Sequence, residues 1–173
     1  PEDRMDQGIA GQESIAENMV SNRYASREFC RGGLLDYKKI DTFADENIRS
    51  YEIRCFGNSQ NVGMLSGGNM QKVVVARECS HDPKVLIAEQ PTRGVDIGAI
   101  EYIHQHLMQM RDSGSAILLI SADLDEVIKL ADRIAVLYEG RIVAEKETGA
   151  FTKTELGYYM LGGNARKEAA DND

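Results

Sequence analysis

Residues 65–72 read Leu-Ser-Gly-Gly-Asn-Met-Gln-Lys, and this stretch decides how the rest of the chain is interpreted. Two adjacent glycines let a loop approach a phosphate or another backbone closely, because neither carries a Cβ. Residues 70–79 contain no Gly or Pro, so a helix is predicted to begin here, with Ser66 as its N-cap and the amides of Gly67 and Gly68 pointing outward. A hydroxyl, bare amides and the positive end of a helix dipole favour an anion, and phosphate is the obvious one. A capped helix without a ligand is the alternative.

A strand is predicted next, and it ends in polar side chains. Residues 85–88, Val-Leu-Ile-Ala, form an apolar run after a turn signal at Pro83 and are typical of a buried parallel strand. Glu89 and Gln90 follow at its carboxyl end, which is where open α/β sheets bind their ligands. Because an idle charge is costly at a buried strand end, we interpret Glu89 as functional rather than as part of a helix-entry turn.

A turn and a second strand continue the pattern. Residues 91–96, Pro-Thr-Arg-Gly-Val-Asp, form a turn into a helix that Asp96 begins. Residues 116–120 are a second strand-like run, and Ala122 follows it. The order is a glycine-rich anion loop, a strand ending in an acid and a strand ending in a small polar segment. It resembles the latter half of an ABC-type ATPase.

The resemblance gives each motif a place. Residues 65–68 match the signature motif, Glu89 and Gln90 end the Walker B strand, Asp96 lies in the D-loop, and Ala122 stands at the switch position. The fold class that this implies is α/β, namely the latter part of a P-loop NTPase parallel sheet with a helical subdomain.

Three segments narrow the resemblance to the second nucleotide-binding domain of tandem ATPase subunits, which power bacterial importers of sugars and nucleosides. They are residues 1–4, 14–18 and 91–96, and the resemblance covers residues 1–161. Gln90 before the proline and the lack of a switch histidine favour the nucleoside branch. Such a subunit is peripheral, at the cytoplasmic face of the plasma membrane.

The Walker A motif, Gly-x-x-x-x-Gly-Lys-Ser/Thr, does not occur in this sequence, so the chain lacks the loop that would hold the phosphates of its own nucleotide. In the family that loop lies upstream. The chain is therefore expected to be a fragment of a longer polypeptide, and inactive as an ATPase when alone.

Three parts are expected along the chain. Residues 1–62 read as a helical subdomain, which in the family faces the membrane-spanning partner. Residues 63–150 read as the second half of a RecA-like core, with the signature, Walker B, D-loop and switch regions. Residues 151–173 read as a C-terminal helix and a flexible tail. Local signals within these parts are a capping box at Ser14 and Glu17 and a hairpin over residues 134–144.

The resemblance also assigns catalytic roles. The reading frame set by Pro91 puts Glu89 where the family holds Mg²⁺ through its water shell, and Gln90 at the water-activating position. A Gln amide hydrogen-bonds a water but does not accept its proton at neutral pH. Ala122 gives the switch position no polar group. Because general-base assistance supplies about two to four orders of magnitude in rate, we expect this domain's own site to be degenerate.

The signature segment is intact, and in the family it closes over ATP held by the Walker A loop of a partner domain. The partner expected here is the N-terminal nucleotide-binding domain of the same polypeptide. The residues implied as contacts to that ATP are Leu65, Ser66, Gly67, Gly68, Asn69, Gln71 and Asp96. A plain N-cap role for Asp96 is compatible with this one.

Composition excludes several other classes. A net charge of −8 and a pI near 5.0 argue against nucleic acid as a partner, since nucleic-acid binding needs a basic surface. The sequence has no apolar run long enough to span a membrane and no signal peptide. Cys30, Cys55 and Cys79 are widely spaced, which suits a reducing compartment, and no Cys/His cluster has metal-site spacing.

Membrane permease subunits are the second partner that the resemblance implies, and their coupling helix would occupy a groove of the helical subdomain. Candidate groove residues are Tyr24, Phe29, Leu34 and Leu35, with internal packing as the alternative role. Two other functions stay open. A soluble ABC-type ATPase unconnected to transport is disfavoured by the acidic charge and the absence of long heptad arms. A docking module without nucleotide is disfavoured by the intact signature.

Overall fold

Helix α1 (Ile15–Val20) begins at the predicted capping box in the computed structural model, which describes residues 7–163. Ser14 Oγ accepts a hydrogen bond from the Glu17 N–H, and the Glu17 carboxylate accepts one from the Ser14 N–H at 2.9 Å. The hydrogen bonds from the Ser14 hydroxyl and amide lower the pKa of Glu17. The chain divides into two compact units between Ile120 and Ser121.

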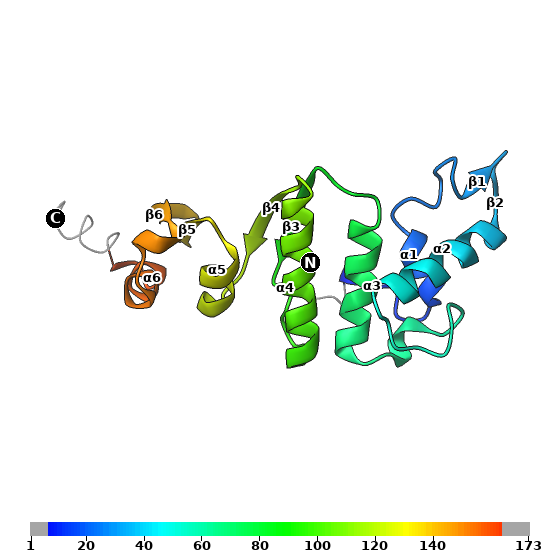
Figure 1. Ribbon diagram of the computed structural model, residues 1–173, viewed down its shortest axis with the longest axis horizontal. Helices are drawn as coiled ribbons and strands as arrows, with labels where there is room; N and C mark the ends of the chain where they lie inside the picture. The colour runs from blue at the N-terminus through cyan, green and yellow to red at the C-terminus, as the bar shows by residue number, and fades with distance from the viewer. Residues whose placement is uncertain (1–6, 164–173) are drawn as a thin grey trace. The chain divides into compact units, whose positions relative to one another are not determined.

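Four helices build the first unit: α1, α2 (Tyr37–Ser50), α3 (Gly67–Cys79) and α4 (Ile97–Asp112). Helix α3 packs against α1 on one side and α4 on the other (Figure 1). A short 3₁₀ turn, Val62–Met64, leads into α3. The largest fully buried side chains of this core are Ile15, Met19, Phe29, Val62 and Val73. Burial of their apolar surface is the main term that stabilises the helix packing.

A small hairpin interrupts the N-terminal helices. Strands β1 (Cys30–Arg31) and β2 (Leu34–Leu35) pair antiparallel across Gly32 and Gly33, whose φ angles are +61° and +85°. Two residues in the left-handed region are what a two-residue hairpin turn requires. The expectation that residues 1–62 are helical is therefore wrong at residues 30–35. These strands were missed because two residues are too few to show an alternating pattern.

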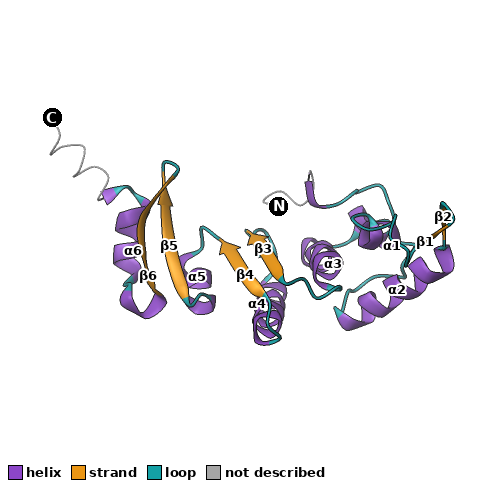
Figure 2. Cartoon of the chain, turned by 90° about the horizontal axis from the view of Figure 1, so that it is seen from above, coloured by secondary structure: helices purple, strands orange, loops and turns teal. Residues whose placement is uncertain are grey.

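Strands β3 (Val85–Glu89) and β4 (Ala116–Ile120) pair parallel, with α4 as the crossover between them (Figure 2). The register runs from Val85 opposite Ala116 to Glu89 opposite Ile120. The predicted strands and their parallel pairing are confirmed. The expected burial of the first strand is wrong on one face, where Val85 and Ile87 are 66% and 64% exposed. Within the described residues this sheet has two strands, and its second face is uncovered.

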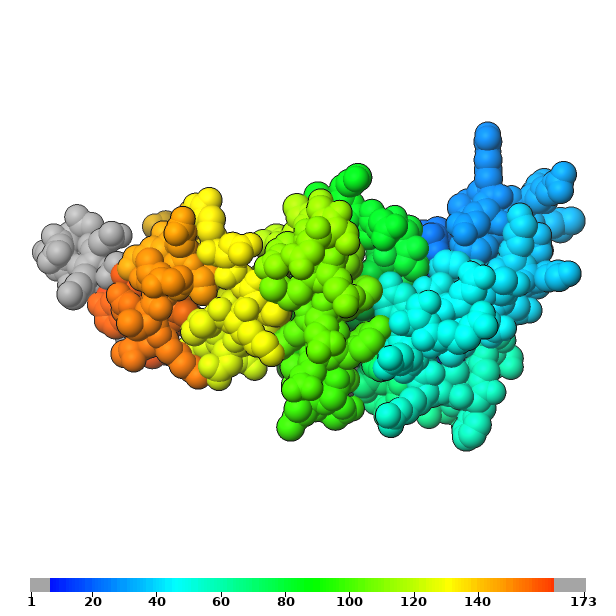
Figure 3. Space-filling view, in the orientation of Figure 1, coloured from blue at the N-terminus to red at the C-terminus, as the bar shows by residue number. Residues whose placement is uncertain are grey.

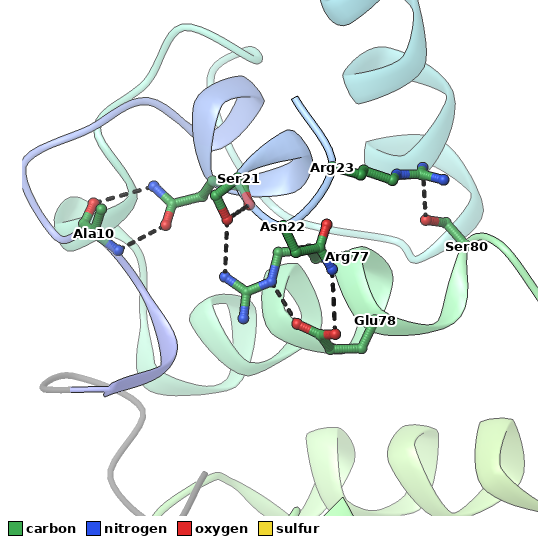
Figure 4. A network of polar contacts seen from close by, with 8 residues as sticks. Ala10, Ser21, Asn22, Arg23, Arg77, Glu78 and Ser80 are labelled. Carbon is green, nitrogen blue, oxygen red and sulfur yellow. Dashed lines mark hydrogen bonds and ion pairs between the residues drawn. The ribbon is translucent and has the colours of Figure 1, made fainter. Parts of the chain in front are cut away.

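Polar contacts join the ends of α1 and α3 (Figure 4). Arg77 donates to Ser21 Oγ at 3.4 Å and to the Glu78 carboxylate at 2.7 Å, and Asn22 donates to the other oxygen of Glu78 at 3.3 Å. Arg23 extends this link by donating to Ser80 Oγ at 3.3 Å. Helix α3, which begins at the signature loop, is thus fixed to α1 at its C-terminal end.

The second unit contains α5 (Leu124–Leu130), β5 (Arg133–Tyr138), β6 (Arg141–Glu147) and α6 (Lys153–Met160), with a 3₁₀ turn at Thr148–Ala150. Strands β5 and β6 form the predicted antiparallel hairpin, turning at Glu139 and Gly140 with φ angles of +45° and +77°. Ile134, Val136 and Leu156 form its core. The expected flexible tail begins at Gly162, and from residue 164 onward it lies outside the described residues.

The division at residue 120 does not follow the expected boundary at residue 62. Side chains from both sides of residue 62 share one core, and the rings of Tyr51 and His106 approach to 4.9 Å. In the space-filling view the atoms of α2 (cyan) adjoin those of α4 (green) (Figure 3). The helical subdomain over residues 1–62, the RecA-like segment over residues 63–150 and the C-terminal part over residues 151–173 stay predictions.

Two further expectations concern the class of protein. Across residues 7–163 no helix combines the length and the apolar character that crossing a membrane requires. The three cysteines are unbonded. Burial raises the pKa of the Cys79 thiol to about 12, so this cysteine stays protonated and unreactive at neutral pH.

Candidate functional site

The signature loop ends in an exposed hydroxyl at the start of α3. Ser66 is the N-cap, with extended backbone angles of −65° and 156°. Its Oγ accepts hydrogen bonds from the Asn69 backbone N–H at 3.4 Å and from Asn69 Nδ2 at 2.9 Å. A serine hydroxyl has one hydrogen to donate, and these two bonds use only its acceptor capacity. The Ser66 O–H is therefore free to turn toward a ligand outside the helix.

Two neighbours of Ser66 serve packing. Leu65 is buried in the core of the first unit, so it anchors the loop. Gly68 is also buried, and a Cβ at this position would lie 2.7 Å from Asp96 Oδ2 and 3.0 Å from Ala99 Cβ. Glycine is thus required at 68 by contact within the chain, whether or not a phosphate binds. Gly67 is half-buried and is the glycine closest to the exposed Ser66 hydroxyl in sequence.

The amide side chains of Asn69 and Gln71 have hydrogen-bond partners within the chain. Asn69 Oδ1 accepts a hydrogen bond from the Arg54 N–H at 2.8 Å. Gln71 Nε2 donates to the Pro91 carbonyl at 2.8 Å in a buried contact. The sequence predicts both residues as contacts to ATP, whereas the structure gives the Gln71 amide and the Asn69 carbonyl oxygen partners inside the chain. Of the predicted signature contacts, Ser66 and Gly67 present the most open groups.

A cavity of about 640 Å³ borders the signature loop, between residues 52–54 and the first turns of α4. Lys72 lines this cavity and links two of its sides. Its Nζ donates to the Glu52 carbonyl at 3.0 Å and lies 4.2 Å from the centre of the Tyr102 ring. Burial, the largest of several causes, raises the pKa of Tyr102 to about 12, so its hydroxyl keeps its proton at neutral pH. The Lys72 charge is therefore used to hold two segments together.

Asp96 begins α4 as the sequence predicts. Its Oδ1 accepts a hydrogen bond from the Ala99 N–H at 3.0 Å, which is an N-cap contact. Its Oδ2 is the atom that faces Gly68. The structure thus brings Asp96 and the signature loop together, while a contact of Asp96 with another domain stays a prediction.

Glu89 and Gln90 lie at the carboxyl end of β3. Glu89 is exposed, so the argument that its charge would be costly there does not hold. Gln90 has φ of +45°, in the left-handed region that non-glycine residues rarely adopt. The Gln90 N–H donates to the Ile120 carbonyl at 2.8 Å, which holds this conformation in place. Strained backbone is often found where a side chain must be aimed at a ligand.

Ala122 belongs to the second unit. It is exposed and lies between Ser121 and Asp123, whose side chain caps α5. Ser121 Oγ accepts a hydrogen bond from the Asp123 N–H at 3.0 Å. The switch position therefore carries no polar side chain of its own, as its residue type dictates.

Within residues 7–163, no group of three or more His, Cys, Asp and Glu side chains is placed to hold a metal ion. Mg²⁺ in nucleotide sites takes one or two carboxylates, with phosphates and waters supplying the other ligands. The exposed Glu89 carboxylate fits such a site, with the phosphates coming from a nucleotide.

Sequence reasoning missed the supporting contacts. Arg54, Lys72 and Tyr102 reach the signature loop from three segments, and only Lys72 lies within the motif itself. Backbone contacts such as the one from Arg54 to Asn69 leave no trace in residue type. They could not be found without the fold.

In sequence, the chain is similar to part of several import ATP-binding proteins. It is 44% identical over 164 residues to the nucleoside import ATP-binding protein NupA of Lactococcus lactis, covering 95% of this chain and 32% of that protein. It is 40% identical over 169 residues to the guanosine import ATP-binding protein NupO of Bacillus subtilis, covering 98% of this chain and 33% of that protein. The chain thus spans about a third of these relatives. No protein-family model matches it.

Solved structures agree on the fold. A dimeric ATP-binding cassette in a post-hydrolysis state, bound to ADP and Pi, superimposes with a TM-score of 0.67 at 23% identity, covering 83% of this chain and 60% of that one. A second cassette, in its ADP conformation, gives a TM-score of 0.60 at 20% identity, covering 87% of this chain and 60% of that one. The predicted class, a P-loop NTPase fold of the ABC type with a parallel sheet and helices, is confirmed. Over about a third of their length the chain is similar to import ATP-binding proteins, and it shares the fold of the ATP-binding cassettes.

Proposed function

We propose that this chain forms part of the ATP-binding subunit of an importer for sugars or nucleosides, and that it supplies the lid over a nucleotide held by a neighbouring domain. The observation that carries the proposal is the Ser66 hydroxyl, which is exposed at the N-terminus of α3 and free to donate. Helix N-termini with free amides suit phosphate. The names of the relatives, which specify nucleoside, guanosine and glucose import, support the solute classes.

The chain's own site is degenerate in this proposal. Glu89 holds Mg²⁺ through water, and Gln90 orients the attacking water without taking its proton. Ala122 leaves the γ-phosphate without a switch side chain. This asymmetry explains why the signature is complete while the Walker B end carries an amide where a base is needed.

The nucleotide neighbour is the N-terminal nucleotide-binding domain of the same polypeptide, and the subunit is peripheral at the cytoplasmic face of the plasma membrane. The dimeric state of the structurally similar cassette supports pairing of two such domains. ATP and Mg²⁺ are the ligands of the paired assembly.

The permease is proposed to dock on a groove of the first unit. A cavity of about 320 Å³ lies beside α1 and α2, lined in part by Val20, Tyr24, Leu35 and Tyr37. Tyr24, Leu34 and Leu35 are exposed, which suits contact with an amphipathic helix. Phe29 is only 1% exposed and packs in the core, so its assignment to this groove is wrong.

A photo-crosslinker placed at Tyr24 or Leu34 is expected to capture the permease in the assembled transporter, because both side chains are open to a partner. Gln109, which is exposed on α4, is the matched control position and should capture little. Mass spectrometry of the cross-linked peptides makes the comparison. Cross-links confined to residues 97–150 would show that the groove is placed wrongly.

The chain by itself is expected to show no saturable MgATP binding in the micromolar range and no hydrolysis. The phosphate cradle and the lysine of a Walker A loop supply most of the phosphate affinity, and the sequence has neither. Titration calorimetry on the chain, with the longer subunit as the positive control, tests this. Micromolar binding to the chain would contradict this prediction, because residues other than a Walker A loop would then hold the phosphates.

A further inference from the structure

Two contacts join the signature helix α3 to the turn that follows β3. Gln71 Nε2 donates to the Pro91 carbonyl at 2.8 Å, and both residues are buried. Asp96 Oδ2 lies against Gly68, at 2.7 Å from the position of a Cβ there. The first contact is a hydrogen bond at the beginning of the 91–96 turn, and the second is a close approach at its end.

The turn is also fixed on its strand side. The Gln90 N–H donates to the Ile120 carbonyl at 2.8 Å, and the Arg93 N–H donates to the Gln90 carbonyl at 3.1 Å. On the other side, the Met70 N–H donates to the Ser66 carbonyl at 2.9 Å, as the first hydrogen bond of α3. Hydrogen bonds therefore link the end of β3, the 91–96 turn and the first turn of α3, which begins at the Ser66 carbonyl.

We propose that Gln71 and Asp96 are positioning residues, which hold the Ser66 end of α3 to the turn that follows Glu89 and Gln90. The inference rests on the proposed lid role of Ser66. Its consequence is that a displacement of this turn moves Ser66 with it. A movement at Gln90, in the chain's own degenerate site, is thereby transmitted to the nucleotide that Ser66 covers.

The chemistry of the Gln71 contact makes the inference testable. Substitution by Met keeps the length of the side chain but removes the donor, which leaves a buried carbonyl without this partner. Substitution by Glu puts an acceptor oxygen against the Pro91 carbonyl oxygen, and the two repel while the carboxyl is ionised. A protonated carboxyl donates again, so the Glu variant carries its own rescue at low pH.

The experiment uses the full-length subunit assembled with its permease, and compares Gln71→Met, Gln71→Glu and the control Gln109→Met on the exposed side of α4. We expect kcat per folded enzyme to fall about tenfold in Gln71→Met with KM for ATP unchanged, because the Walker A domain binds the nucleotide and the lid acts on closure. Gln71→Glu should lose more at about pH 8 and recover partly at about pH 6, while Gln71→Met shows no such recovery. Gln109→Met should match the unmodified protein.

A readout without nucleotide accompanies the rates. In the nucleotide-free subunit, hydrogen exchange in residues 66–70 and 91–96 should accelerate together in Gln71→Met, because one contact holds both segments. Exchange in the two segments that changes independently, or a Gln71→Met variant that equals Gln109→Met in both readouts, overturns the inference. Activity that survives Ser66→Arg instead overturns the lid role, so the two failures are distinct.

A second pair of variants covers the case in which Gln71→Met does not fold. Gly68→Ala forces a Cβ against Asp96 Oδ2 and should lower kcat about tenfold. Asp96→Ser removes that oxygen while keeping an N-cap side chain, and should by itself lower kcat, because the contact with Gly68 is lost. If kcat of Asp96→Ser equals that of the unmodified protein, the Asp96 contact does not position the lid.

Discussion

Replacing Ser66 with Arg is expected to abolish nearly all steady-state ATPase activity of the assembled transporter. The Ser66 hydroxyl is exposed at the N-terminus of α3, where the proposed γ-phosphate of the neighbouring nucleotide would lie. A long guanidinium side chain at this position occupies the space of that phosphate and blocks closure, although its charge alone would attract it. The measurement is the ATPase rate in the reconstituted transporter, with nucleotide binding to the neighbouring domain measured alongside.

Gln90→Ala is the matched comparison and should lower the rate much less. In the proposed assignment, Gln90 stands in a site that lacks a general base, and a general base contributes about two to four orders of magnitude in rate. Gln90→Glu alone should not restore that site, because Ala122 still leaves the phosphate without a switch side chain. A loss in Gln90→Ala as deep as that in Ser66→Arg would mean that this domain's own site hydrolyses the ATP. The catalytic site and the degenerate site would then be exchanged.

Helix starts were predictable because their determinants are local. Ser14, Ser66 and Asp96 each cap the helix that the sequence assigned to them. A cap needs one side-chain oxygen and the two or three residues after it, all of which are visible in sequence. The parallel pairing of β3 with β4 was also predictable, since a helix between two apolar runs dictates a crossover.

Contacts between distant segments were not predictable. The Gln71 amide was expected at a nucleotide, yet it donates to the Pro91 carbonyl, 20 residues along the chain. Nothing in the residue type of Pro91 marks its carbonyl as an acceptor, because every residue has one. The predicted burial of β3 is wrong for a related reason. An apolar run predicts that both faces of the strand are covered, whereas the described residues cover only one.

Phe29→Ala is expected to destabilise the chain by about 3–5 kcal/mol, because truncating a fully buried Phe leaves a large cavity. The Phe29 ring is 1% exposed and packs edge-on against Phe43, with ring centres 5.2 Å apart. The Arg23 guanidinium lies over both rings, at 5.4 Å from the centre of Phe29 and 4.5 Å from that of Phe43. Losing the Phe29 ring therefore also removes part of the surface on which Arg23 rests.

Urea unfolding followed by circular dichroism measures the free energy of unfolding from the midpoint at constant slope. Tyr24→Ala is the control, because its ring is exposed and its loss should change stability by about 0.5 kcal/mol or less. The two variants should also separate in the assembled transporter, where Tyr24→Ala weakens permease contact in a chain that remains folded. If Phe29→Ala were as stable as Tyr24→Ala, the packing of the Phe29 ring would not stabilise the core.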